Sequence, residues 1–129
     1  MGAWGHRSFE NDDALDLVWS VEEQGIGAIE VALKGALIPP GDYLEAPEAS
    51  AAIAAAEFVA AKKTGNADRL QGENIKLLDS FDVSPKLIAD SKAAVGRVLQ
   101  NSELRELWTE ADDFSAWHDD VLLLLERLQ

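Results

Sequence analysis

The sequence has 129 residues, and its 11 Lys and Arg against 24 Asp and Glu give a formal net charge of −13. This length fits a single folded domain over 1–129 that buries its own core. The absence of cysteine excludes a disulfide framework, a thiolate nucleophile and a zinc site of the cysteine type. The longest apolar stretch, residues 46–61, contains two Glu and falls short of the roughly 20 apolar residues that a membrane-spanning helix needs.

Acidic residues are spread along the whole chain, and the densest basic pair is Lys62–Lys63. A surface that follows phosphates needs clustered Lys and Arg, so we expect neither nucleic acid nor an anionic membrane as a partner. The charge has two interpretations: it serves solubility alone, or it steers a basic protein partner onto the surface. The opening residues reach FENDD before any apolar region develops. We therefore expect no secretory signal and a cytoplasmic location.

The first two helices are predicted by caps and by apolar periodicity. Asn11 is a good N-cap for a helix over residues 12–24, with acids in the first turn and Gly25 as a stop. Apolar residues at near-helical spacing then predict a second helix over 26–37, which Pro39-Pro40-Gly41 ends. A strand-like structure over 26–31 is the alternative.

A loop over 40–46 precedes an alanine-rich helix that Pro47 opens and Gly65 follows. Further cap and proline signals predict two longer helices, 85–99 and 113–128, and two short helical segments, 74–81 and 103–111. We find no repeat and no linker. The patterns together predict an all-α fold, a compact single-domain bundle of five to six helices around the central alanine-rich helix.

Glu57 is a charged residue in an unusual position, because it lies midway along the alanine-rich helix, on the side opposite Lys62 and Lys63. Small side chains on nearly every face of this helix imply that other helices approach it closely, which would bury Glu57. A buried carboxylate needs donors. The alternatives are a Glu57 on a solvated strip of the helix and a Glu57 with a catalytic or ligand-binding role.

The opening GAWG offers donors for such a carboxylate. Gly2 and Gly5, which lie on either side of Trp4, let the backbone turn tightly and expose N–H groups, with Trp4 as an apolar anchor. Arg105 has two options: a surface pair with Glu106 or Glu110, or a buried contact with Glu57 or Asp13. We predict a buried polar cluster drawn from these elements: Trp4, Gly5, Asn11, Asp12, Asp13, Asp16, Tyr43, Glu45, Glu57 and Arg105.

Motifs for catalysis and for metal or nucleotide binding are missing. There is no HExxH, GxSxG, GxxxxGK[ST] or GxGxxG pattern. His6 with Asp12, Asp13, Asp16 and Glu45 could converge on a hard cation, but acids that open a helix are more often caps. We therefore predict no catalytic residue, no metal and no cofactor.

Three tryptophans fall on predicted helices, with Trp19 at the edge of an apolar face and Trp108 and Trp117 further along the chain. The simplest interpretation places all three in the core. A half-exposed tryptophan would instead be an interface anchor.

Three separated motifs resemble an uncharacterised bacterial family, domain of unknown function 4259. They span essentially the whole chain: MGAWG with Phe9, Asn11-Asp12 and Ala14-Leu15-Asp16; Tyr43-Leu44-Glu45-Ala46 with Ala55-Ala56-Glu57; and Asn101 to Trp108 with Trp117 and Arg127-Leu128. The resemblance implies a small bacterial protein and supplies no activity, cofactor or partner.

Two functions from different classes follow. The first is a non-enzymatic acidic module, monomeric or homodimeric, that binds a basic protein in an inhibitory or immunity-type role. The alternative is a small enzyme, or a ligand- or metal-binding domain, with an acidic site built on Glu57, Asp13 and the GAWG segment. The missing catalytic motifs favour the first.

Overall fold

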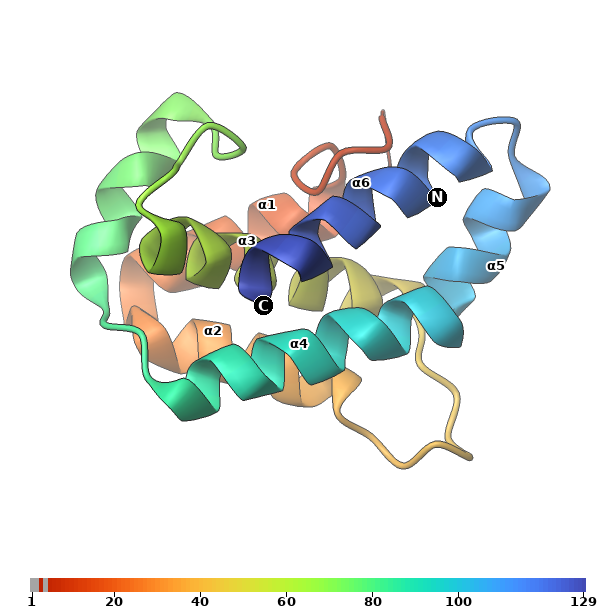
Figure 1. Cartoon of the computed structure of the whole chain (residues 1–129), viewed down its shortest axis with the longest axis horizontal. Helices are drawn as coiled ribbons and strands as arrows, with labels where there is room; N and C mark the ends of the chain where they lie inside the picture. Colours follow the sequence, from red (N-terminus) through yellow and green to blue (C-terminus); the bar gives the residue numbers. More distant parts are fainter. Residues whose placement is uncertain (1–2, 4) are drawn as a thin grey trace.

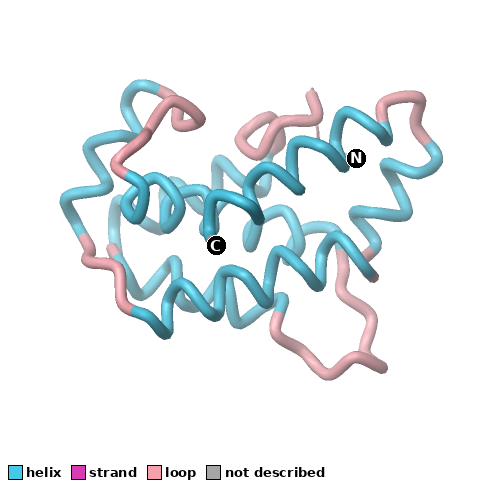
Figure 2. The backbone as a smooth tube through the Cα atoms, in the orientation of Figure 1, coloured by secondary structure: helices cyan, strands magenta, loops and turns pink. Residues whose placement is uncertain are grey.

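The computed structural model describes residue 3 and residues 5–129, and within that part it contains six α-helices and one 3-10 helix. The helices are α1 (Asp12–Gln24), α2 (Ile26–Ala36), α3 (Ala46–Thr64), η1 (Gly72–Ser80), α4 (Pro85–Gln100), α5 (Glu103–Glu110) and α6 (Phe114–Leu128). The predicted all-α class is confirmed, whereas five to six helices is too few. Loops join the helices in Figure 2, and in the described part the only strand-like pairing is an isolated bridge between Ala3 and Asn11.

Local side-chain chemistry sets the helix starts. The Asn11 side chain accepts a hydrogen bond from the Ala14 N–H at 2.8 Å and so caps α1. Ser84 and Ser102 cap α4 and α5 in the same way, each accepting from the N–H three residues on. These caps confirm the predicted starts of α1, α4 and α5.

Glycines with positive φ end α1 and α3. Gly25 has φ 60° and Gly65 has φ 75°, a conformation that residues with a side chain rarely adopt. α2 begins directly after Gly25, so residues 26–31 are helical and the strand-like alternative is wrong. The segment predicted as a helix over 74–81 is the 3-10 helix η1.

α3 is the central helix, as predicted, and it contacts every other helix of the described part. Figure 1 shows it crossing the middle of the molecule, with α4 and α6 in front of it and α1 and α2 behind it. All residues from 52 to 61 are buried, and most are alanine. Small side chains let the neighbouring helices approach α3 closely on all sides, so any polar residue in this stretch must find its partners inside the protein.

The loop between α2 and α3 is tied to the rest of the fold. The Arg97 guanidinium on α4 donates to the backbone carbonyls of Ile38, Pro39 and Asp42. The Glu103 N–H also donates to the Leu44 carbonyl at 2.9 Å. These bonds make the loop a fixed connector.

No helix in the described part of the chain is both long enough and apolar enough to cross a membrane.

Candidate functional site

Glu57 lies in the middle of α3 with its side chain only 1% exposed. Its Oε2 accepts hydrogen bonds from Ser8 Oγ at 2.6 Å and from Arg69 Nη2 at 2.8 Å. Arg69 Nε also lies 3.1 Å from Oε1, and Arg127 Nη1 lies 3.4 Å from the same oxygen. Asp120 Oδ2 completes the group by accepting from Arg69 Nη2 at 3.1 Å. We call these five residues the Glu57 cluster.

The cluster joins distant parts of the sequence. Ser8 lies in the segment before α1, Arg69 in the turn after α3, and Asp120 and Arg127 on α6. Positions 120 and 127 are about two helical turns apart and therefore share a face of α6. Two carboxylates face two guanidinium groups, which balances the charge that α3 carries into the core.

This geometry leaves Glu57 little freedom for chemistry. A general base needs an oxygen that is free to take a proton from a substrate, but both Glu57 oxygens already accept from charged donors. Arg69 is likewise shared between Glu57 and Asp120. A polar depression of about 420 Å³ lies between the segment before α1 and residues 68–71, and four residues of the cluster line it: Ser8, Glu57, Arg69 and Asp120. The cluster satisfies a buried charge and fastens three segments to α3.

The structure corrects the predicted donors to Glu57. Trp4 lies outside the described residues, so the expectation for it is not addressed. Gly5 is half-buried, and among the described residues no backbone N–H donates to Glu57. The early segment still contributes, but through the hydroxyl of Ser8.

Arg105 does not reach Glu57 or Asp13. Its Nε donates to the Leu99 carbonyl at 2.7 Å, and its guanidinium lies 5.3 Å from the centre of the Phe114 ring. Arg105 thus joins the end of α4 to the start of α6. The prediction of an inward contact with Glu57 is wrong because α5 starts beside the end of α4 and directs Arg105 there.

The acids that open α1 do not enter the Glu57 cluster either. Asn11 is the cap described above, and Asp12 and Asp16 are exposed on α1. Asp13 is half-buried, and its pKa is raised by burial and by the negative charges of Asp16, Asp12 and Glu48. The prediction that all these residues share one buried cluster is therefore wrong.

Tyr43 and Glu45 are also exposed, contrary to the prediction. The Tyr43 hydroxyl donates to Glu106 Oε2 at 2.8 Å. This bond, with the nearby charges of Glu103, Glu106 and Glu45, raises the pKa of Tyr43 to about 12. Glu45 precedes α3 as its N-cap residue without a side-chain cap bond. Both residues belong to the surface around the α2–α3 loop.

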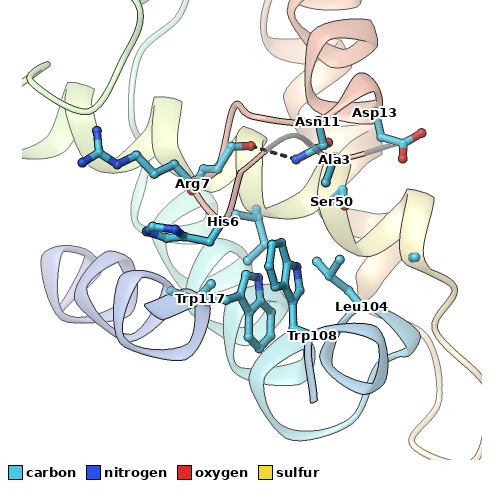
Figure 3. Close-up of a pocket in the computed structure, with 13 residues that line it drawn as sticks. Ala3, His6, Arg7, Asn11, Asp13, Ser50, Leu104, Trp108 and Trp117 are labelled. Carbon is cyan, nitrogen blue, oxygen red and sulfur yellow. Dashed lines mark hydrogen bonds between the residues drawn. The ribbon is translucent and has the colours of Figure 1, made fainter. Parts of the chain in front are cut away.

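A small cavity lies under the segment before α1 (Figure 3). Trp108 and Trp117 line it from one side, near His6, whereas Asn11 and Ser50 line the other side. Its volume is about 30 Å³, which is room for roughly one water molecule and far below the volume of a substrate pocket.

Two of the three predicted core tryptophans are buried, namely Trp108 and Trp117. Trp19 is not: its side chain on α1 is 72% exposed, and Leu15 one turn earlier is exposed as well. The buried residues of α1 occupy an arc of about 100°, and positions 15 and 19 fall outside it. The core prediction for Trp19 is thus wrong, because the side chain lies on the surface of α1.

Sequence reasoning missed four members of the Glu57 cluster: Ser8, Arg69, Asp120 and Arg127. One signal for the pair on α6 was present, because Asp120 and Arg127 each directly adjoin an apolar residue that faces the core, Val121 and Leu128. An Arg at the edge of an apolar stripe is a natural partner for a buried acid. Arg69 and Ser8 carry no comparable local signal.

Among the described residues, no group of three or more His, Asp or Glu side chains is placed to hold a metal ion. No curated protein and no solved structure matches the chain. A family model does match, over residues 2–120, and the family is described as a domain of unknown function. This match covers all three motifs apart from Met1 and the final Arg127-Leu128, and it confirms the resemblance seen in the sequence. The chain therefore belongs to the DUF4259 family.

Proposed function

We propose that this protein is a non-enzymatic acidic module that binds a basic partner protein, in an inhibitory or immunity-type role. The observation that supports this proposal best is the exposed Trp19 on α1. A tryptophan in water exposes a large apolar surface, and tryptophan is among the residues most enriched at the energetic centres of interfaces.

The surroundings of Trp19 favour a basic partner. Leu15 lies one turn before it and extends the apolar patch, while Asp12, Asp16 and Glu23 on the same helix are exposed. An apolar anchor with acids around it complements a surface that carries apolar groups among Lys and Arg. The net charge of −13 would add long-range attraction and accelerate association.

The alternative function, an acidic catalytic or ligand site, has less support. It needs Glu57 and Asp13 to act together, but Glu57 lines the depression beside Arg69 and Asp13 lines other cavities. Glu57 is also committed to its Arg donors.

Affinity capture from the native host tests the proposal. We expect the immobilised protein to retain a specific basic protein at about 50 mM salt and to release it at about 500 mM salt, because exposed charges are screened over a few ångströms at high ionic strength. Trp19→Ala should abolish capture. The matched control is Leu123→Ala, which removes a 52% exposed apolar side chain from α6 and should leave capture intact. Retention that ignores salt, or equal capture by both variants, would contradict the proposal.

A further inference from the structure

An apolar groove of about 410 Å³ runs between α1, α2 and the start of α3. The α1 wall is formed by Asp13, Asp16, Leu17, Ser20 and Gln24, which share one face of that helix. The rest of the lining is small or apolar: Ala28, Val31, Ala32 and Gly35 of α2 and Pro47 and Ala51 of α3, with Glu48 beside them. Trp19 is not part of this lining, so the groove is a second surface on α1.

The floor of the groove is open to water although it is apolar. Val31 is 70% exposed, and Gly35 contributes no side chain at all. A Cβ atom at Gly35 would lie 3.9 Å from the Glu48 side chain, so its absence widens the groove at this end. Exposed apolar surface in a concave site gains free energy when a partner covers it.

One end of the groove carries uncompensated negative charge. Asp13 and Asp16 on α1 and Glu48 on α3 all line it, and among the described residues none of them forms an ion pair. Burial raises the pKa of Asp13, and the negative charges of Asp16, Asp12 and Glu48 raise it further. A cationic side chain placed there would relieve the repulsion between these carboxylates.

We propose that this groove binds an amphipathic helix of a partner protein, with its apolar face on the groove floor and its Lys or Arg side chains at Asp13, Asp16 and Glu48. A helix is the fitting occupant because the groove walls are helices and provide no strand edge for an extended peptide. The small side chains of the floor let a helix axis approach closely. The α1 wall from Asp13 to Gln24 is about 16 Å long, which three turns of helix cover. The basic class of partner rests on the proposed function.

Two synthetic helical peptides test the groove. Both have leucines at positions i, i+3, i+4 and i+7; one carries lysines toward one end and the other carries glutamates at the same positions. We expect the lysine peptide to bind with a measurable Kd in isothermal titration calorimetry and to shift the amide resonances of the groove residues in NMR spectra. The glutamate peptide should not bind, because the acids repel it.

Matched variants separate the groove from general attraction to an acidic protein. Replacing Asp13, Asp16 and Glu48 by their amides should weaken binding of the lysine peptide by about tenfold. The amides of Glu73, Glu110 and Glu126 change the net charge equally but lie outside both the groove and the surface around Trp19, and they should leave the Kd nearly unchanged. Val31→Ala should weaken binding, whereas Leu123→Ala should not. Equal losses for the two charge variants, or no effect of Val31→Ala, would overturn the inference.

Two further outcomes count against it in distinguishable ways. Sedimentation that shows a dimer, dissociated by Val31→Ala, would assign the groove to a second copy of this chain. Capture of a basic host partner that the groove variants retain in full would leave the proposed function standing and remove the groove from it.

Discussion

Glu57→Gln probes the most heavily bonded side chain of the core. The substitution preserves shape but removes the charge, and it turns an amide NH₂ toward donors that need an acceptor. Removing one partner of a buried ion pair costs about 3–5 kcal/mol. The cost here should be smaller, because Gln keeps one oxygen and both Arg side chains retain other acceptors.

These remaining acceptors determine how much stability Glu57→Gln loses. Arg69 still has Asp120, and Arg127 still donates to the Asn66 carbonyl at 2.6 Å. Both guanidinium groups also keep some contact with water, since their side chains are 23% and 19% exposed. We therefore expect Glu57→Gln to lower the free energy of unfolding by about 2–3 kcal/mol.

Thermal unfolding followed by circular dichroism measures this loss. For a protein of 129 residues, 1 kcal/mol corresponds to roughly 4 °C, so we expect the Tm to fall by about 8–12 °C. The matched control is Glu22→Gln, an exposed acid on α1 that forms no side-chain bond within the described residues, and it should change the Tm by less than about 2 °C. Ser8→Ala should fall between the two, because the carboxylate keeps both Arg donors. A Glu57→Gln protein that melts with the control would refute the account of the cluster.

Three other predictions follow from exposed or half-buried groups. Tyr43 is the single tyrosine, so its ionisation can be followed by ultraviolet absorbance. We expect a titration midpoint at about pH 12 for the wild type and a midpoint closer to 10.0 for Glu106→Gln, which loses the hydrogen bond that raises the pKa. A wild-type midpoint near 10.0 with helix content intact would contradict this. An NMR titration should place the pKa of Asp13 above its ordinary 3.8, and Asp16→Asn should lower this pKa, because Asp16 has the largest effect among the neighbouring charges. Since the pKa of Asp13 is raised in the folded state, the ionised Asp13 carboxylate destabilises the fold at neutral pH, and this destabilisation disappears as the carboxylate is protonated at low pH. Arg97→Met should speed hydrogen exchange in the loop between α2 and α3 and lower the free energy of unfolding by about 1–3 kcal/mol, because three carbonyls of this loop lose their donor. Unchanged exchange in the loop would count against the role of Arg97.

Features that depend on neighbours in the sequence could be predicted. Asn11, Ser84 and Ser102 cap helices through an N–H only three residues away, and Gly25 and Gly65 end helices through their own backbone. Such interactions need no knowledge of the tertiary fold. The starts of α1, α4 and α5 followed from them, and together with the apolar periodicity they gave the all-α class.

Features that depend on packing between helices could not be predicted from the sequence. Periodicity grouped Trp19 with the apolar face of α1, but it does not say how much of that face the neighbouring helices cover. The donors to Glu57 come from segments far from it in the sequence, and the pattern of one helix carries no information about them. Arg105 was a reasonable candidate donor to Glu57 because of its charge, but in the fold its side chain binds the Leu99 carbonyl at the end of α4 instead.

The Glu57 cluster couples the local unfolding of three separate segments. The segment before α1, the turn after α3 and the last turn of α6 all bind the same carboxylate, so detaching any one of them leaves a charge in the core short of a partner. Fraying at one of these places therefore weakens the attachment of the other two, and we expect their backbone amides to exchange with solvent deuterium in a single concerted opening.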